Sequence, residues 1–240
     1  MNGLFYSENP SSRAHKVYLD SIYDQKEYEN NNLLLGDNAT RILYLDPKMM
    51  GFIFARHKFV AKMMDGYSKV LEIGCQEGLG SVIVAKNVQH LVAIDFYKPY
   101  IQSCQERLNN FTNIEFRGFD IVEKPIKENF DGIFALDVIE HISPDSEDQF
   151  MLNIIKSLSG INGVCIIGTP SLESQQYASE SSKIGHINCK TGIQLQNFCK
   201  RFFHKVFMFA MNDEVLHVGY LKMGHYLMAL CINPKQELVT

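Results

Sequence analysis

A glycine turn between a buried strand and a helix is the feature that most constrains this chain. Residues 69–80 read Lys-Val-Leu-Glu-Ile-Gly-Cys-Gln-Glu-Gly-Leu-Gly. Val70, Leu71 and Ile73 predict a buried strand, Gly74 and Gly78 predict a turn, and a helix is expected to open at about Leu79. Such a turn lets backbone N–H groups approach a ligand closely, and the helix N-terminus adds partial positive charge. The segment therefore predicts a ligand-binding unit of strand, turn and helix.

Acidic residues at the strand ends narrow the choice of ligand. Glu72 would repel a pyrophosphate group but could pair with a cationic amino group. This suggests S-adenosylmethionine, which has an amino-acid tail and a ribose but no phosphate. The next apolar strand, residues 90–95, ends in Asp95, which follows Gly74 by 21 residues (95 − 74). That spacing matches the one at which an acid accepts hydrogen bonds from ribose hydroxyls.

Two later strand ends also carry acids. In the run Gly-Phe-Asp-Ile at 118–121, Asp120 could accept the exocyclic amine of adenine, and the buried run at 130–137 ends in Asp137. Each acid taken alone could equally be a helix N-cap. Four strand ends in order, with three acids and a glycine turn, favour the ligand site. The residues predicted to bind the cofactor are Glu72, Gly74, Gly78, Asp95, Phe96, Asp120, Ile121 and Asp137.

With this order of motifs, residues 55–232 resemble the class I, Rossmann-like S-adenosylmethionine-dependent methyltransferases. The resemblance implies an α/β fold with a doubly wound, mostly parallel seven-stranded sheet, helices on both faces and an antiparallel strand from a C-terminal hairpin. The chain departs from the family at one position of the turn. A third glycine is common where this chain has Gln76, which needs an allowed backbone angle there.

Alternating apolar and polar runs predict the remaining elements. Strands are expected near 70–74, 91–95, 114–118, 131–136 and 163–168, followed by two closing strands at 203–209 and 226–232. Helices are expected near 46–65, 79–87, 97–110, 146–159 and 191–202. The Ser- and Gln-rich stretch 171–183 predicts a loop of the kind that forms a lid or an acceptor-binding segment. We predict an N-terminal extension or helical cap over the cleft at 1–50, and the methyltransferase domain at 51–240.

Composition excludes several other classes. The 240 residues, 46% of them hydrophobic, suffice for one α/β domain and an extension. A net charge of −4 offers no basic surface, which makes nucleic acid an unfavoured partner. Six cysteines without a Cys-x-x-Cys pair indicate free thiols in a reducing compartment. With neither a signal peptide nor a membrane span predicted, we expect a cytoplasmic protein with a small-molecule substrate and no membrane partner. The sequence leaves a homodimer open.

A second cluster of polar residues follows the fourth strand, beyond the carboxyl end where ligands of such sheets bind. It contains Asp137, Glu140 and His141, and His186 could complete the set. Carboxylate and imidazole ligands suit Mg²⁺, Mn²⁺, Fe²⁺ or Zn²⁺. The pattern resembles two metal-dependent branches of the family, the ubiquinone-pathway O-methyltransferases and the small-RNA 3′-end 2′-O-methyltransferases. That resemblance implies a divalent cation that binds the acceptor hydroxyl, although Asp137 stands where Glu is more usual.

Two alternatives to a metal site remain: His141 could be a general base without a metal, or the cluster could have neither role. An alkyl hydroxyl has a pKa far above 7, so its methylation needs a metal or a base. The cluster therefore predicts an O-methyltransferase with Glu140, His141 and His186 as catalytic residues. The polar lid favours a sugar, a sugar nucleotide or a phosphorylated metabolite, as in a surface-polysaccharide or secondary-metabolite pathway. The alternatives are RNA-end 2′-O-methylation and a non-catalytic cofactor-binding module.

The sequence also gives expectations for single side chains outside these two groups. His57 is expected on the surface, and the neighbouring Arg56 could meet the cofactor carboxylate. His217 and His225 could line the acceptor pocket, although His225 could also be a polar group at a strand start. Tyr177 in the predicted loop is expected to be solvated.

Overall fold

The computed structural model describes residues 14, 16–18, 20–21 and 34–238. Leu35–Thr240 forms one compact unit, to which the following description applies. Residue 50, where the sequence predicts a boundary, lies within a helix of this unit. The predicted cap formed by residues 1–50 falls partly outside the described residues and stays a prediction.

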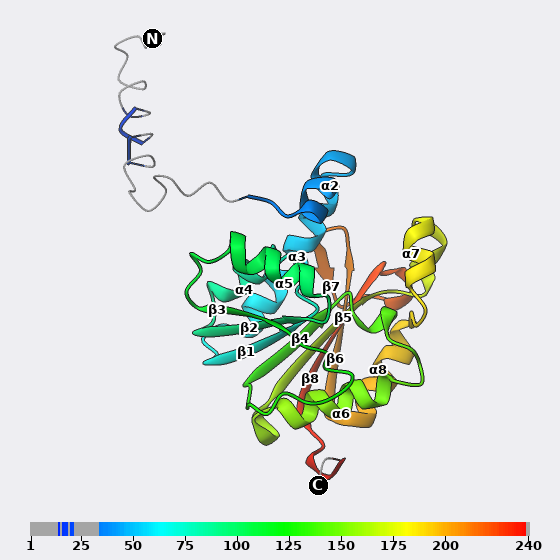
Figure 1. Cartoon of the computed structure of the whole chain (residues 1–240). Helices are drawn as coiled ribbons and strands as arrows, with labels where there is room; N and C mark the ends of the chain where they lie inside the picture. The colour runs from blue at the N-terminus through cyan, green and yellow to red at the C-terminus, as the bar shows by residue number, and fades with distance from the viewer. Residues whose placement is uncertain (1–13, 15, 19, 22–33, 239–240) are drawn as a thin grey trace. The chain divides into compact units, whose positions relative to one another are not determined.

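Within the described residues, eight strands form one sheet in the order β3-β2-β1-β4-β5-β8-β6-β7 (Figure 1). The strands are β1 (Lys69–Ile73), β2 (His90–Asp95), β3 (Ile114–Gly118), β4 (Gly132–Leu136), β5 (Val164–Pro170), β6 (Phe203–Asn212), β7 (Val215–His217) and β8 (Tyr226–Pro234). The first five strands are parallel, and β8 lies antiparallel between β5 and β6. The α/β class and the antiparallel pairing of the two closing strands are therefore confirmed. The predicted number of seven strands is wrong, because the edge strand β7 has three residues, too few to give an alternating pattern.

Helices cover both faces of the sheet. They are α2 (Asp37–Leu45), α3 (Lys48–Met63), α4 (Ser81–Ala85), α5 (Lys98–Arg107), α6 (Glu147–Ser157), α7 (Glu180–Gly185) and α8 (Gly192–Phe202). Short 3₁₀ helices are η2 (Ile139–His141), η3 (Gly160–Asn162), η4 (Glu173–Tyr177), η5 (Leu221–Met223) and η6 (Gln236–Leu238). In Figure 1, α3, α4 and α5 lie above the strands and α6 and α8 below them. The expected doubly wound arrangement follows from this alternation of strands and helices.

The segment predicted as a loop at 171–183 is instead built of η4 and most of α7. Ser179 caps α7 by accepting a hydrogen bond from the backbone N–H of Ser182. Serine and glutamine are common in loops, but their side chains can also satisfy the backbone of a short helix. Composition alone therefore did not distinguish these two outcomes.

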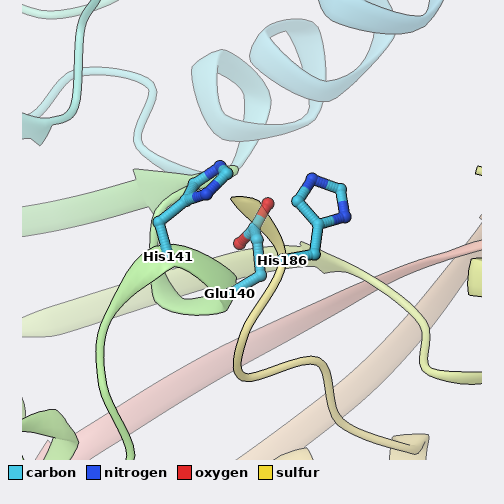
Figure 2. Close-up of side chains that lie close together, drawn as sticks. All are labelled: Glu140, His141 and His186. Carbon is cyan, nitrogen blue, oxygen red and sulfur yellow. The ribbon is translucent and has the colours of Figure 1, made fainter. Parts of the chain in front are cut away.

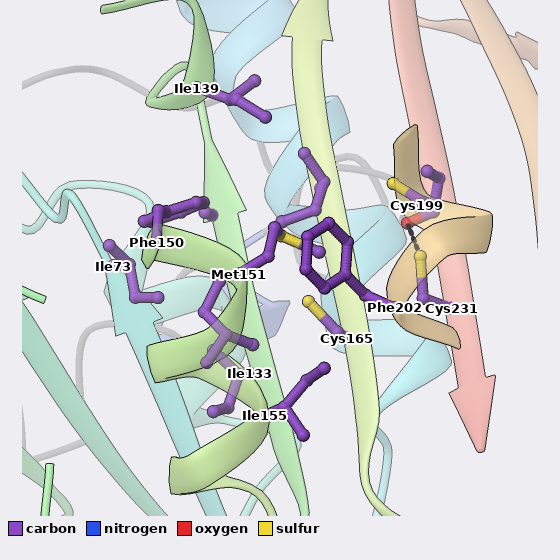
Figure 3. Close-up of a cluster of buried hydrophobic side chains, with 14 of the residues drawn as sticks. Ile73, Ile133, Ile139, Phe150, Met151, Ile155, Cys165, Cys199, Phe202 and Cys231 are labelled. Carbon is purple, nitrogen blue, oxygen red and sulfur yellow. Dashed lines mark hydrogen bonds between the residues drawn. The ribbon is translucent and has the colours of Figure 1, made fainter. Parts of the chain in front are cut away.

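The core on the lower face packs α6 and α8 against the sheet (Figure 3). Phe150, Met151 and Ile155 of α6 contact a cluster that includes Ile73 of β1 and Ile133 of β4. All six cysteines lie within the described residues and are free thiols, three of them in this cluster. Among the described residues, no helix is both long and apolar enough to cross a membrane.

Because β1 to β5 run parallel, the carboxyl ends of β1, β2, β4 and β5 lie at the same edge of the sheet, where the site is found.

Candidate functional site

The glycine turn after β1 has the backbone conformation that the sequence predicts. Gly74 and Gly78 adopt φ angles of 77° and 73°, in the left-handed region that glycine enters without steric cost. Gln76 also lies in this region, with a φ of 47°, so the turn keeps its shape where the family commonly has a third glycine. The N–H of Gln76 donates a 3.0 Å hydrogen bond to Oδ2 of Asp95. This bond ties the turn to the end of β2.

A cavity of about 720 Å³ opens beside this turn. Of the residues predicted to bind the cofactor, it is lined by Gly74, Asp95, Phe96, Asp120, Ile121 and Asp137. A second cavity of about 340 Å³ adjoins it and is lined by Glu72. Gly78 lines neither cavity, because it packs on Leu108 and Phe116, which a Cβ atom would meet at 2.7 and 2.9 Å. All but one of the predicted cofactor contacts therefore face the two cavities.

Asp95 and Asp120 both shape the larger cavity. Oδ1 of Asp95 accepts from the N–H of Tyr97 at 2.8 Å, and Oδ1 of Asp120 accepts from the N–H of Val122 at 2.8 Å. Burial raises the pKa of Asp95, while its hydrogen bonds from Tyr97 and Gln76 act in the opposite direction. A carboxylate has about four lone-pair positions, so each acid keeps acceptor capacity for a ligand.

Glu72 lies at 2% exposure on β1 and pairs with His57 of α3. His57 Nε2 is 3.4 Å from Oε1 of Glu72, and its Nδ1 donates to the carbonyl of Ile53 at 2.8 Å. Burial by itself lowers the pKa of His57. The hydrogen bond to Glu72 and the charge of Glu72 raise it by more, so the net pKa lies above the usual value for histidine. The surface position predicted for His57 is wrong, because its side chain is 13% exposed.

The second carboxylate oxygen of Glu72 fits the predicted role in binding an amino group. Oε2 is buried and has no hydrogen-bond partner within the described part of the chain. A buried carboxylate oxygen without a donor is costly unless a ligand supplies one. Because Glu72 lines the smaller cavity beside Gly74, the ammonium group of an amino-acid tail would supply that donor.

Asp137 forms an ion pair with Arg56. The sequence suggested the cofactor carboxylate as the partner of Arg56 and did not indicate Asp137. Nη1 of Arg56 lies 2.9 and 3.1 Å from the two carboxylate oxygens of Asp137. The guanidinium also stacks on the ring of Tyr226, with Cζ 3.7 Å from the ring centroid. The structure therefore places Asp137 in an ion pair between the two cavities, and not with the other predicted metal ligands.

The structure brings the other three predicted ligands together. One ligand atom from each of Glu140, His141 and His186 lies within 4.8 Å of the others. Figure 2 shows the Glu140 carboxylate between the two imidazole rings. Glu140 and His141 come from η2, which follows β4, whereas His186 follows α7, so a segment distant in sequence supplies the third group.

Glu140 is fully buried, and its two oxygens differ. Oε2 accepts a 3.0 Å hydrogen bond from Oγ1 of Thr169, while Oε1 has no partner among the residues described. Burial, and then the charge of Asp137, raise the pKa of Glu140 to about 8. An unpaired buried carboxyl oxygen beside two imidazoles is a feature that a bound cation would satisfy.

Hydrogen bonds assign the tautomers of both imidazoles. Nδ1 of His141 donates to the carbonyl of Gly185 at 2.9 Å, and Nδ1 of His186 donates to Oε1 of Gln175 at 2.8 Å. Carbonyl oxygens only accept, so Nδ1 carries the proton in each neutral ring and Nε2 keeps its lone pair. Burial and the nearby His141 lower the pKa of His186, which favours its neutral form. Both Nε2 atoms are thus available to a proton or a cation.

The remaining predicted residues lie outside this group. Tyr177 is 83% exposed, as expected. Neither His217 nor His225 lines the two cavities: His217 contacts Asn212, and His225 packs against Phe52 with ring centroids 5.8 Å apart. The predicted acceptor-pocket role of these two histidines finds no support in the structure.

The helix α2, which lies within the segment 1–50 predicted as an extension or helical cap, forms part of the lining of the smaller cavity. Asn38, Ala39 and Ile42 of α2 line it. Glu77, from the glycine turn, caps this helix: its two carboxylate oxygens accept from the N–H groups of Asn38 and Ala39, each at 3.0 Å. The capping residue lies 38 and 39 positions away, so no local motif could have revealed it.

Comparison with known proteins agrees with this arrangement. The family described as "Methyltransferase domain" matches residues 65–214. A carboxy-S-adenosyl-L-methionine synthase of Helicobacter pylori (strain HPAG1) is 28% identical over 102 residues, which cover 41% of this chain and 42% of that protein. A ubiquinone biosynthesis O-methyltransferase of Rickettsia typhi (strain ATCC VR-144 / Wilmington) is 28% identical over 110 residues, covering 45% and 44%. The chain thus matches less than half the length of these curated relatives.

Among solved structures, the N-methyltransferase NodS from Bradyrhizobium japonicum WM9 in complex with S-adenosyl-L-homocysteine has the same fold. Its TM-score is 0.63 at 19% identity, and the match covers 85% of this chain and 95% of NodS. The family match extends over more than half of the chain, across the glycine turn and the strand ends that line the cavities. The chain therefore belongs to the methyltransferase-domain family, and it shares the Rossmann-like fold of NodS.

Proposed function

We propose that this chain is an O-methyltransferase that transfers the methyl group of S-adenosylmethionine to a hydroxyl of a small polar metabolite. The acceptor is a sugar, a sugar nucleotide or a phosphorylated compound. The observation that carries the proposal is the group formed by Glu140, His141 and His186. All three line the 340 Å³ cavity, which shares Gly74, Gln76, Asp137 and His141 with the larger cavity where the cofactor is expected.

The proposed chemistry follows from the acceptor. The sulfonium of the cofactor is already reactive, so alignment supplies much of the acceleration, but an alkyl hydroxyl must also lose its proton. Glu140, His141 and His186 would hold a divalent cation, which would lower the pKa of an acceptor hydroxyl. Without a cation, Nε2 of His141 would itself take the proton. In both versions Glu72 would hold the amino group of the cofactor at the smaller cavity, which Glu72 lines.

The lining of the smaller cavity supports a compact acceptor. Ile42, Met49 and Ile53 contribute apolar surface to its lining, while Ser182 and His186 contribute polar groups. The net charge of −4 argues against RNA as the acceptor, because phosphate contacts by Lys and Arg dominate nucleic-acid affinity. A nitrogen acceptor, as the name of NodS implies for that protein, would not need groups that lower the pKa of a hydroxyl.

The test is a turnover screen that follows release of S-adenosylhomocysteine. The acceptors are sugars, sugar nucleotides, phosphorylated metabolites, amino sugars and RNA ends, each with and without EDTA. Hydroxyl methylation that EDTA abolishes, and that a borderline cation such as Mn²⁺ restores, supports the proposal. EDTA-insensitive turnover lost in His141→Ala, by about 10²–10⁴, supports the version with His141 as the base.

A matched control separates loss of chemistry from loss of structure. His204 is exposed on β6, away from both cavities, so His204→Ala should keep full activity. His186→Ala should be severely impaired if a cation is used and mildly impaired if it is not. Turnover restricted to RNA ends or to amino groups would overturn the proposed acceptor class, and a fully active, EDTA-insensitive His141→Ala would overturn both versions of the chemistry.

A further inference from the structure

Gln175 in η4 hydrogen-bonds to one of the three groups that would bind a cation. We propose that it is a positioning residue that holds His186 in the Nδ1–H tautomer and so determines how tightly Glu140, His141 and His186 bind a divalent cation. The inference rests on the proposed function, because it concerns the cation site assigned there. Gln175 itself lines neither cavity and acts through His186.

Two hydrogen bonds fix the orientation of the Gln175 amide. Its Oε1 accepts from Nδ1 of His186 at 2.8 Å, and its Nε2 donates to the carbonyl of Ser171 at 3.2 Å. Rotating the amide by 180° would place Oε1 against the Ser171 carbonyl, two acceptors face to face. The amide therefore presents an acceptor to His186, and the imidazole must place its proton on Nδ1.

Each of the three cation-binding groups has a hydrogen-bond partner on one of its polar atoms. Thr169 holds Oε2 of Glu140, the Gly185 carbonyl holds Nδ1 of His141, and Gln175 holds Nδ1 of His186. What remains is one oxygen of Glu140 without a partner and two Nε2 lone pairs. Outer partners of this kind set the orientation and basicity of metal ligands.

Loss of the Gln175 acceptor should change the tautomer of His186. A neutral histidine side chain in water favours the Nε2–H form, and a hydrogen bond at the other nitrogen decides the form in a protein. Without Gln175, Nε2 of His186 would carry the proton and would offer no lone pair to a cation. A cation would then have to displace that proton to the other ring nitrogen before His186 could bind it.

The experiment is nitrogen-15 NMR of the histidine side chains, on full-length protein in EDTA at about two pH units above the usual histidine pKa. His186 is assigned by the signal missing in His186→Ala. Wild type should show the Nδ1–H form and Gln175→Ala the Nε2–H form. Gln175→Glu retains an acceptor and should restore Nδ1–H. The control is Gln176→Ala, which removes an exposed neighbour that donates to the Glu173 carbonyl and should change nothing.

Calorimetric titration with Co²⁺ or Mn²⁺ alone gives the second readout. Gln175→Ala should bind about 10–100-fold more weakly than wild type, with Gln176→Ala unchanged. Equal cation affinity in wild type and Gln175→Ala, or an Nε2–H form of His186 in wild type, would overturn this inference and leave the proposed function standing. Absence of cation binding by wild type would instead overturn the cation-assisted function, and the tautomer measurement would still decide the role of Gln175 toward His186. Unfolding temperatures of the variants check that each is folded.

Discussion

Arg56 and Asp137 join the helix before the sheet to the end of its fourth strand. A single guanidinium nitrogen, Nη1 of Arg56, lies 2.9 and 3.1 Å from the two carboxylate oxygens of Asp137. Arg56 is 9% exposed and the Asp137 side chain 33%, so the pair is only partly screened by water. Because Asp137 lines both cavities, this ion pair holds in place a side chain that the expected cofactor and acceptor sites share.

Removing the arginine should therefore destabilise the fold. Arg56→Ala leaves Asp137 without its partner and removes the stacking on Tyr226, so we expect a loss of about 2–3 kcal/mol in the free energy of unfolding. Urea denaturation measures this. Lys183→Ala is the control, since Lys183 pairs with the exposed Glu180 and should cost less than about 1 kcal/mol. Equal effects of the two substitutions would contradict the structural role of the Arg56–Asp137 pair.

Cofactor affinity should depend on Asp95. Asp95→Ala removes the proposed ribose contact and the acceptor for the N–H groups of Gln76 and Tyr97, which shape the turn. The loss of charge-assisted hydrogen bonds is worth roughly 2–3 kcal/mol, so binding of S-adenosylhomocysteine should weaken at least about tenfold. Calorimetry provides the measurement, and Asp65→Ala, in the exposed turn after α3, is the control. Unchanged affinity in Asp95→Ala would rule out the ribose assignment.

Glu140 should make stability pH-dependent in the metal-free protein. Its pKa of about 8 exceeds the ordinary 4.5, so between these pH values the folded chain holds a proton that the unfolded chain has released. The free energy of unfolding therefore falls as pH rises through this window, by up to about 1.4 kcal/mol per pH unit, and the contribution is fully present below the ordinary pKa.

Glu140→Gln keeps the size of the side chain and removes its titration. Unfolding followed in EDTA between about pH 5 and pH 9 should give a flatter stability profile for the variant, which should exceed wild type in stability at the alkaline end. The difference between the two profiles cancels contributions from other groups, such as Asp95, whose pKa is also raised. Parallel profiles would show that Glu140 titrates normally in the folded chain.

The stability of α2, which lines the smaller cavity, should depend on the cap that Glu77 provides. Glu77→Ala removes the acceptor for the N–H groups of Asn38 and Ala39, with an expected cost of about 1–2 kcal/mol. Gly36→Ala should have a similar effect from the other side of the contact, because its Cβ would lie 2.3 Å from the Glu77 carboxyl carbon. Limited proteolysis should cut first near α2 in both variants. The exposed Glu106→Ala is the control, and if it is cleaved as readily, the proposed cap is not what holds α2.

Most of the fold could be predicted from local patterns along the chain. The strands β1, β2 and β4 consist mainly of apolar residues, and the turn after β1 needs left-handed backbone angles that glycine supplies. The order of strands and helices then leaves few ways to build the sheet. Local patterns failed at β7, which is too short to show a period, and at η4 and α7, whose composition resembles that of a loop.

The sequence by itself determined which side chains gather at one edge of the sheet, because the carboxyl ends of parallel strands meet there. It did not determine how those side chains pair. Arg56 binds Asp137, His57 binds Glu72, and Glu77 caps α2 across distances in sequence that no local motif spans. Likewise, the approach of His186 to Glu140 depends on where α7 packs. Such partners are chosen by proximity after folding, when burial makes an unpaired charge or polar atom costly, and only the tertiary structure decides them.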